Sequence, residues 1–197
     1  MEQYKLNEKQ KIEKRIFDVI ISIIVIIITS PIMILIAIAI KIDSKGPVIY
    51  KQKRITKDGK EFTMYKFRTM IDNAEKETGP ILAKKKDERI TKVGKILRRT
   101  RLDELTQFFN VIKGDMSIVG PRPERKELIE KIIKELPEYR IREQVKAGIT
   151  CIAHIEGDYY TEPKVRLEYD KMYMKDWSIK KDIKIIFKTI LKVIKEL

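Results

Sequence analysis

The feature that most constrains this chain is an uncharged, apolar run of 22 residues from Val19 to Ile40. About 20 such residues are enough to cross the hydrocarbon core of a bilayer as a helix. Pro31 lies near the middle of the run and follows Ser30. Proline has no backbone N–H, and its ring clashes with the carbonyl oxygen four residues earlier, here that of Ile27. The Ser30 hydroxyl can hydrogen-bond to a carbonyl one turn back, which lowers the cost of a break in lipid.

Basic residues flank this run on both sides. Lys14 and Arg15 precede it, and Lys41 and Lys45 follow it. Lysine and arginine mark the cytoplasmic side, so a segment that crosses once should show a bias between its ends. The similar flanks favour a re-entrant segment, a helix that enters one leaflet, breaks at Ser30-Pro31 and returns. A kinked helix that spans the bilayer and the core helix of a soluble protein remain alternatives.

The composition predicts one compact domain with an attached membrane segment. Of the 197 residues, 43% are hydrophobic and 37% are charged. We expect residues 1–41 to form a basic segment and the re-entrant hairpin, and residues 42–197 to form a cytoplasmic, membrane-associated domain. The net charge of +14 favours polyanionic partners, namely nucleic acid, acidic lipids or phosphorylated substrates. The single cysteine and single histidine exclude an intrachain disulfide and a zinc site built from them.

The pattern after the apolar run predicts a mostly α-helical fold with a small β-hairpin. The hairpin turns at Asp58-Gly59, and its return strand covers 62–67. Helices are expected at 91–99, from Thr100 to Gly114, and at about 124–136. A last basic helix has a row of isoleucines on one face and lysines over much of the rest. It can lie in a membrane interface or pack on the domain core. The isoleucines are Ile179, Ile183, Ile186, Ile190 and Ile194.

Two adjacent carboxylates, Asp103 and Glu104, are the strongest candidates for chemistry. In this interpretation they lie in the first turn of the helix capped by Thr100, where acidic residues are common as caps alone. Adjacent carboxylates can also share a divalent cation, and a helix N-terminus near arginines suits a phosphate. Arg122 lies between two prolines, which restrict the backbone on both sides of it, and Lys66 lies on a predicted strand. The residues alone therefore suggest Mg²⁺-assisted phosphoryl transfer at a membrane surface.

Several motifs together resemble the bacterial sugar transferase family, the small monotopic phosphoglycosyl transferases. They are "KRIFD", "SP", "YKFRTM", "LDELTQFFNVIKGDMSIVGPRPE" and the ending "YD…Y…WSI…DIKIIFKT", and they cover nearly the whole chain from Lys14 onward. The resemblance implies transfer of a sugar-1-phosphate from a nucleoside diphosphate sugar, normally a UDP-sugar, to a polyprenyl phosphate. It also implies a place in the inner membrane with the catalytic domain at the cytoplasmic face. A nucleic acid partner is not expected, because it would leave the apolar run unexplained and the sequence has no recognisable basic-aromatic module. A homo-oligomer remains open.

The same resemblance implies residue roles. Asp103 is the expected nucleophile, Glu104 is its acidic partner, and Mg²⁺ is expected at this dyad. The expected phosphate and donor ligands are Lys66, Arg98 and Arg122. Ser30-Pro31 matches the break of a re-entrant membrane helix. The rival hypothesis is a non-enzymatic protein that binds anionic lipid surfaces through its charge and its last helix.

One stretch departs from the family pattern. The usual sequence is close to "RPGITGxAQVNGRN", whereas this chain has "KAGITCIAHIEGDYY" from Lys146. Lys146 replaces arginine, Ala147 replaces proline, His154 replaces glutamine and Asp158 replaces arginine. Losing a cation and gaining an anion at Asp158 is expected to alter donor binding. We interpret His154 as a polar pocket or core residue, because its counterpart does not titrate.

Overall fold

The computed structural model describes residues 4, 6–74, 87–157 and 161–197, and Asp158 lies outside them. The described chain is mostly helical with a small antiparallel hairpin, as predicted. In chain order the elements are α1 (Glu8–Asp43), β1 (Ile49–Ile55), the 3₁₀ turn η1 (Lys57–Gly59), β2 (Glu61–Phe67), α2 (Lys92–Thr100), the 3₁₀ turn η2 (Leu102–Glu104), α3 (Gln107–Lys113), β3 (Ser117–Val119), α4 (Lys126–Glu135), the 3₁₀ segment η3 (Pro137–Gln144), β4 (Gly148–Thr150), α5 (Ile152–Glu156), α6 (Pro163–Lys175) and α7 (Ile179–Glu196).

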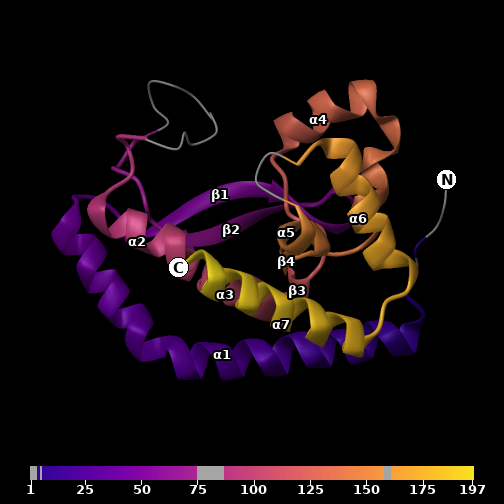
Figure 1. Cartoon of the computed structure of the whole chain (residues 1–197), viewed down its shortest axis with the longest axis horizontal. Coiled ribbons are helices and arrows are strands. Elements are labelled where there is room, and N and C mark those ends of the chain that lie inside the picture. Colours follow the sequence, from indigo (N-terminus) through magenta and orange to yellow (C-terminus); the bar gives the residue numbers. More distant parts are fainter. Residues whose placement is uncertain (1–3, 5, 75–86, 158–160) are drawn as a thin grey trace.

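The long helix α1 underlies the other elements. Figure 1 shows α1 along one side of the molecule, with α7 beside it, the β1–β2 hairpin above, and α4 and α6 on the opposite side. The main core lies between these layers and includes Phe62, Val111, Met116 and Ile185, all buried. A second cluster joins the C-terminal part of α1 to the hairpin and α2 through Ile40, among others. Both α1 and the β1–β2 hairpin therefore contribute residues to each cluster.

The hairpin forms where the sequence predicts it. β1 pairs antiparallel with β2, from Ile49 opposite Phe67 to Ile55 opposite Glu61. Asp58 and Gly59 both have positive φ, at 58° and 71°, which is the conformation that Asp-Gly tolerates in tight turns. Asn110 of α3 then fixes the hairpin, since its side-chain amide donates to the Thr63 carbonyl (2.7 Å) and accepts from the Tyr65 amide (3.0 Å).

A second sheet was not predicted from the sequence. β3 and β4 form a two-stranded parallel pair, with Ser117 opposite Gly148 and Val119 opposite Thr150. Gly148 of β4 lies directly against the backbone of Gly120, the residue that follows β3. A Cβ at Gly148 would lie 2.1 Å from the backbone nitrogen of Gly120, far inside ordinary contact. The segments that follow β3 and β4 are consequently held side by side.

The structure does not divide the apolar segment into two helices at Pro31. α1 is assigned as one helix of 36 residues with Pro31 inside it, and Figure 1 shows that it is bent. Ser30 Oγ donates to the carbonyl oxygen of Ile27 at 2.9 Å. That carbonyl is the one that Pro31 leaves without its usual N–H partner. The hydroxyl therefore replaces the missing donor, which allows the helix to continue through the proline.

The first half of α1 is tied to the last helix by a buried polar cluster, which we call the α1–α7 joint. Its centre is Asp182, which is fully buried. The Asp182 carboxylate accepts from Lys14 Nζ (2.7 Å), Tyr173 OH (2.9 Å) and Trp177 Nε1 (3.1 Å). Lys14 of the motif "KRIFD" and Asp182 of the motif "DIKIIFKT" therefore have a structural role.

Two further side chains of "KRIFD" bind the body of the domain. Arg15 donates to the carbonyl oxygens of Val111 (2.6 Å) and Ile112 (2.7 Å) at the end of α3. Asp18 is buried and accepts from Ser117 Oγ at 2.7 Å. The N-terminal part of α1, which lies before the predicted boundary at residue 41, is therefore bound to the domain formed by residues 42–197.

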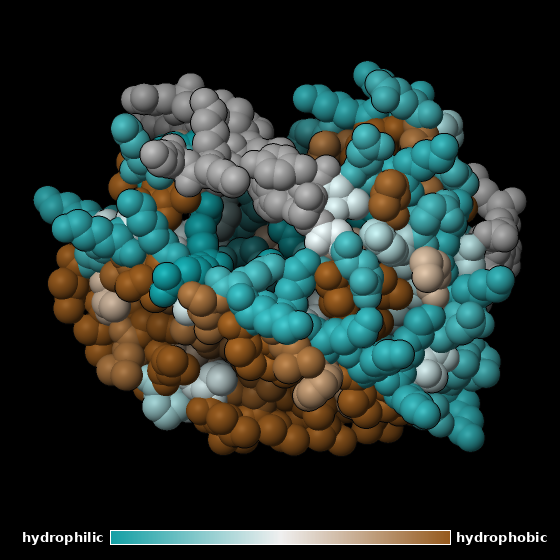
Figure 2. Space-filling view, in the orientation of Figure 1, coloured by the Kyte–Doolittle hydropathy of each residue, from teal (hydrophilic) through white to brown (hydrophobic). Residues whose placement is uncertain are grey.

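The outer face of α1 and α7 is apolar and uncovered. Figure 2 shows a continuous hydrophobic surface along the side of the molecule formed by α1 and the adjoining part of α7. Monomeric soluble proteins rarely expose contiguous apolar patches of more than a few hundred Å². In α1 the most exposed members include Ile27, Ile28, Leu35 and Ile42. In α7 the exposed members are Ile183, Phe187, Ile190, Leu191 and Ile194.

The predicted isoleucine face of the last helix is divided in the structure. Ile183, Ile190 and Ile194 are exposed, whereas Ile179 and Ile186 pack against the main core. Phe187 lies on the exposed face with 60% of its surface accessible. α7 thus packs on the core and presents an apolar surface at the same time. Among the described residues, α1 is the one helix long and apolar enough to cross a membrane.

Candidate active site

The two carboxylates lie in a tight turn between helices. The prediction that Thr100 caps a helix that runs from Thr100 to Gly114 is wrong. α2 ends at Thr100, whose hydroxyl donates backwards to the Ile96 carbonyl at 2.9 Å. Arg101 then adopts the left-handed conformation (φ 58°, ψ 14°), and η2 carries Asp103 and Glu104. The dyad therefore lies in a 3₁₀ turn that follows a left-handed residue, and not in the first turn of an α-helix.

Both carboxyl groups are withdrawn from solvent. Asp103 is 8% exposed, and the Glu104 side chain is 15% exposed. Lys66 Nζ of β2 lies 2.6 Å from Glu104 Oε1 and forms an ion pair with it. The structure thus brings the strand-borne lysine predicted from the sequence to the dyad. The clamp of Asn110 on β2 sets this contact, because it fixes β2 against α3 directly after η2.

The two carboxyl groups have opposite electrostatic environments. Burial raises the pKa of Asp103, as does the neighbouring Glu104, and these effects outweigh the cations Lys66 and Arg98. Burial also disfavours the charged form of Glu104, but Lys66 and Arg122 outweigh it and hold the pKa of Glu104 below its ordinary value. Adjacent carboxylates commonly divide in this way. The negative charge of the dyad therefore resides first on Glu104.

Arg98 reaches the site from α2. Its Nε donates to Thr69 Oγ1 at 2.9 Å, just after the end of β2. The helix lies very close to this segment, because a Cβ at Gly94 would be only 2.0 Å from the Thr69 carbonyl oxygen. The guanidinium lowers the pKa of Asp103, although burial prevails. Arg98 is thus a cation oriented by Thr69 on the Asp103 side of the dyad.

Arg122 reaches the site from the segment after β3. Pro121 and Pro123 flank it, and its own carbonyl oxygen accepts from Arg142 Nη2 at 3.0 Å. Its Nη1 lies 2.6 Å from His154 Nε2 on α5. Arg122 is also one of the cations that lower the pKa of Glu104. Sequence reasoning found Arg122 but missed this contact, because the pairing of β3 with β4 carries no sequence signal.

A buried ionic network braces the segment that carries Arg122. Glu124 is 5% exposed and is paired with Arg166, with Arg142 at 3.7 Å and with Arg54 at 3.9 Å. Arg142 also pairs with the buried Asp170 at 2.9 Å. Buried ions of this kind are stable only when they are paired. The "GPRPE" loop is therefore rigid at its glutamate end.

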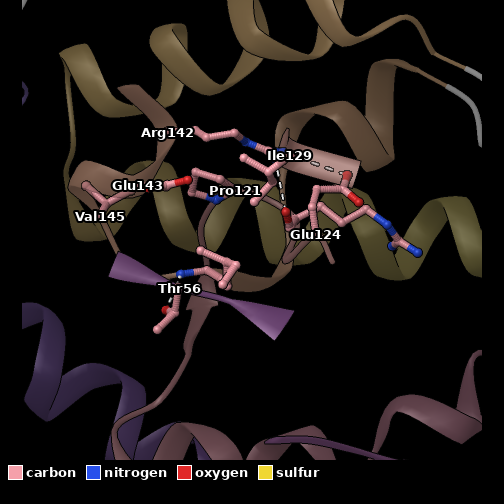
Figure 3. A pocket seen from close by; sticks show the side chains of 10 residues that line it. Thr56, Pro121, Glu124, Ile129, Arg142, Glu143 and Val145 are labelled. Atoms are coloured by element: carbon pink, nitrogen blue, oxygen red, sulfur yellow. Dashed lines mark hydrogen bonds and ion pairs between the residues drawn. The ribbon is translucent and has the colours of Figure 1, made fainter. Parts of the chain in front are cut away.

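A small cavity lies within this network. Figure 3 shows Thr56, Pro121, Glu124 and Arg142 around it. Its volume of about 20 Å³ is room for one water molecule and far too little for a nucleotide. The substrate region must therefore be more open. Figure 2 shows a hollow lined by hydrophilic residues in front of the hairpin, on the side away from the apolar face.

The dyad suits a metal that shares its ligands with a substrate. Within the described ranges, no three His, Cys, Asp or Glu side chains form a cluster that could hold a metal ion. The protein therefore offers two carboxylates, one of them already paired with Lys66. Mg²⁺ is commonly bound by one or two carboxylates together with substrate phosphates and water. Asp103 and Glu104 fit that arrangement.

Two of the positions that depart from the family pattern have structural roles. The Ala147 N–H donates to Thr56 Oγ1 at 3.1 Å, a bond that a proline at this position could not make. His154 occupies the contact with Arg122 described above. Lys146 is half-buried next to β4, and burial lowers its pKa. Ala147 and His154 therefore both make hydrogen bonds to other residues of the domain, and His154 makes its bond to a candidate site residue, Arg122.

The chain is similar to several known transferases. The chain is 46% identical over 194 residues (95% of the chain) to UDP-glucose:undecaprenyl-phosphate glucose-1-phosphate transferase of Klebsiella pneumoniae. It is 41% identical over 180 residues (90% of the chain) to UDP-N-acetylgalactosamine-undecaprenyl-phosphate N-acetylgalactosaminephosphotransferase of Aeromonas hydrophila. It is 36% identical over 186 residues (91% of the chain) to the UDP-glucose:undecaprenyl-phosphate glucose-1-phosphate transferase of Caulobacter vibrioides.

The chain spans 41%, 42% and 68% of the lengths of these three relatives, respectively. Residues 9–196 match the bacterial sugar transferase family. This match covers the dyad, Lys66, Arg98, Arg122 and the long apolar helix. The chain therefore belongs to the bacterial sugar transferase family.

Proposed function

We propose that this protein transfers a sugar-1-phosphate from a nucleoside diphosphate sugar, normally a UDP-sugar, to a membrane polyprenyl phosphate. The products are a polyprenyl diphosphate sugar and a nucleoside monophosphate. The observation that carries the proposal is the convergence of Lys66, Arg98 and Arg122 on two adjacent, largely buried carboxylates. The names of the relatives, which are undecaprenyl-phosphate sugar phosphotransferases, support the same substrate classes.

The proposed reaction has two displacements. An oxygen of Asp103 attacks the donor phosphorus that bears the sugar, and the bond from this phosphorus to the bridging oxygen breaks. The nucleoside monophosphate leaves with that bonding pair, and an aspartyl phosphosugar remains. An oxygen of the polyprenyl phosphate then attacks the same phosphorus and releases the Asp103 carboxylate. One pocket can thus serve a soluble donor and a lipid acceptor in turn.

The remaining residues position and stabilise charge. Lys66 holds Glu104 by an ion pair, which keeps its carboxylate beside the nucleophile. Arg98 and Arg122 approach the dyad from two different elements and would neutralise charge on the phosphates. Mg²⁺, held by Asp103 and Glu104, would polarise the phosphate oxygens of the donor. Each cation is placed by a contact of its own, so little reorganisation is needed when the donor binds.

The test of this mechanism separates a covalent from a direct transfer. Purified protein is incubated with the UDP-sugar and Mg²⁺ but without polyprenyl phosphate, and its intact mass and released monophosphate are measured. We expect a burst of monophosphate equal to the enzyme concentration and a phosphosugar adduct on Asp103. Asp103→Asn should form no adduct while it keeps its fold and membrane attachment. Monophosphate that appears only with both substrates present would establish direct transfer.

The same assay addresses the rival of a non-enzymatic lipid-binding protein. Such a protein would release no monophosphate with any donor. A panel of nucleoside diphosphate sugars with polyprenyl phosphate identifies the donor, if there is one. Burial of the dyad favours the enzyme, because a surface binder gains nothing from two carboxylates withdrawn from water next to each other.

We further propose that α1 is re-entrant and that the protein is monotopic at the cytoplasmic face of the inner membrane. The basic flanks, the bend in α1 and the apolar outer face of α1 and α7 support this placement. Cysteines at Lys9 and Lys51, in a Cys151→Ser background, should both resist an impermeant thiol reagent in intact cells. Labelling of only one of them would establish a full span. Pro31→Leu restores the N–H donor and should favour spanning.

A further inference from the structure

The contact between Arg122 and His154 follows from the parallel strand pair. Val119, at the end of β3, lies opposite Thr150, at the end of β4. The chain leaves both strands at the same edge, so the segments that follow them are neighbours. Arg122 lies three residues beyond β3, and His154 lies four residues beyond β4 on α5. Their side chains meet with Arg122 Nη1 2.6 Å from His154 Nε2.

This contact fixes the protonation state of the histidine. A guanidinium has N–H donors and no acceptor, so His154 Nε2 must be the acceptor. The ring is therefore neutral, with its proton on Nδ1. Its surroundings agree, because burial and the charge of Arg122 lower the pKa of His154 well below its ordinary value. The histidine consequently acts as a hydrogen-bond acceptor and not as a proton donor toward the site.

The acceptor contacts the tip of a side chain whose backbone is already fixed. The backbone of Arg122 is fixed by Pro121, Pro123 and the bond from Arg142 to its carbonyl oxygen. An arginine side chain loses about 2 kcal/mol of rotamer entropy when it is ordered. The bond to His154 contributes to that ordering and gives the guanidinium a defined direction before the substrate arrives.

The helix that carries His154 is itself anchored. Lys192 Nζ of α7 donates to the carbonyl oxygens of Ile155 (3.1 Å) and Gly157 (2.9 Å) at the end of α5. The pair between Lys188 and Glu156 (2.9 Å) is exposed to solvent and adds little to this anchor. α5 is therefore held in place by α7, and His154 can orient the Arg122 guanidinium.

We propose that His154 is a positioning residue that holds the Arg122 guanidinium beside Glu104, where it meets a phosphate of the donor. The inference rests on the function proposed above, because it assigns Arg122 to the substrate phosphates. It gives His154 a role that differs from general acid or base catalysis. A residue that accepts one hydrogen bond at the same place and never ionises should serve as well.

The first test reads the geometry without any turnover. His154 is the one histidine in the sequence, so ¹⁵N-histidine labelling gives a single pair of ring nitrogen signals. We expect an unprotonated Nε2 and a protonated Nδ1 at neutral pH in wild-type protein. Arg122→Met removes the donor and should relax this tautomer. A protonated Nε2 in the wild-type protein would overturn the proposal, whether or not the protein is an enzyme.

The second test measures donor kcat/KM. His154→Leu should lower it about ten- to a hundred-fold, the size of one hydrogen bond to a charged group. His154→Gln places an amide oxygen near Nε2 and should restore most of the loss. In the Arg122→Met background, His154→Leu should cost no more than about two-fold, because the partner is already gone. Full additivity of the two substitutions would refute a role through Arg122.

The control variant is Glu156→Gln on the same helix. It removes an exposed ion pair and leaves the Arg122 contact in place, so kcat/KM should not change. If wild-type protein shows the expected tautomer but no turnover with any donor, the proposed function fails and the contact stands. If turnover is present and His154→Gln is as impaired as His154→Leu, the positioning role fails and the function stands.

Discussion

Replacement of Gly94 by alanine tests how closely α2 must approach the end of β2. Helix propensity alone predicts a gain, because alanine in a helix interior is about 0.8–1 kcal/mol better than glycine. The structure predicts a loss. An added Cβ would lie 2.0 Å from the Thr69 carbonyl oxygen, 2.7 Å from its carbonyl carbon and 2.8 Å from its Cα. These are backbone atoms, which cannot rotate away as a flexible side chain can.

The size of the loss follows from the displacement. Ordinary contact begins at 3.4 Å, so α2 and the Thr69 backbone must separate by more than 1 Å. Overpacking of this kind costs about 1–3 kcal/mol. After the propensity gain is subtracted, we expect the free energy of unfolding to fall by up to about 2 kcal/mol. Separation also draws Arg98 away from the dyad, and a misplacement of about 1 Å can lower a rate roughly 10²-fold.

Two measurements check this prediction. Chemical unfolding in detergent gives the change in stability, and the monophosphate burst gives the change in the first displacement. Lys95→Ala is the control, because Lys95 is exposed on the same helix and its loss should change stability by less than about 0.5 kcal/mol. A Gly94→Ala protein that is as stable and as active as the wild type would show that the close approach of α2 to Thr69 is wrong.

Three other predictions concern the joint, the membrane face and the metal. Asp182→Asn removes the nearer carboxylate partner of a nearly buried Lys14 and should lower the free energy of unfolding by about 3 kcal/mol, the lower end for a broken buried pair, because Asp18 remains 3.9 Å away; denaturant titration measures the loss, and a value under about 1 kcal/mol would contradict the joint. In liposomes, a nitroxide at Ile190→Cys (Cys151→Ser background) should be more accessible to O₂ than to a soluble nickel chelate, and one at Lys188→Cys the reverse; equal accessibility would place α7 in water. Chelation should abolish monophosphate release, and added Mg²⁺ should restore it; release that persists in the chelator would remove the metal from the proposal.

Local patterns predicted the local elements. The Asp58-Gly59 dipeptide predicted the hairpin turn because few other residues accept positive φ at both positions. Gly114 predicted the end of α3 for the same reason, and its φ is 94°. The prediction failed between these signals, at Thr100. A threonine hydroxyl can cap a following helix or bond back to a preceding one, and the left-handed Arg101, which decides between them, has no sequence signature.

The candidate residues of the site were predictable from the motifs, but most of their contacts were not. Lys66 and Glu104 meet because Asn110 fixes β2 against α3. The sequence of a helix that contains an asparagine does not indicate which strand that asparagine binds. β3 and β4 have three residues each, too few to show a period of two. The contact between Arg122 and His154 depends on that pair and became visible only in three dimensions.

The α1–α7 joint also sets an order in which the protein can be assembled. Lys14 and Asp182 are separated by 168 residues in the chain. At about 5–20 residues per second, the ribosome needs roughly ten to thirty seconds to make the intervening chain. During that interval α1 is already synthesised, yet Lys14 has no Asp182 to pair with. The Lys14 contact of the first helix is therefore completed only by the last one, and a chain stalled before α7 would leave Lys14 without its Asp182 partner.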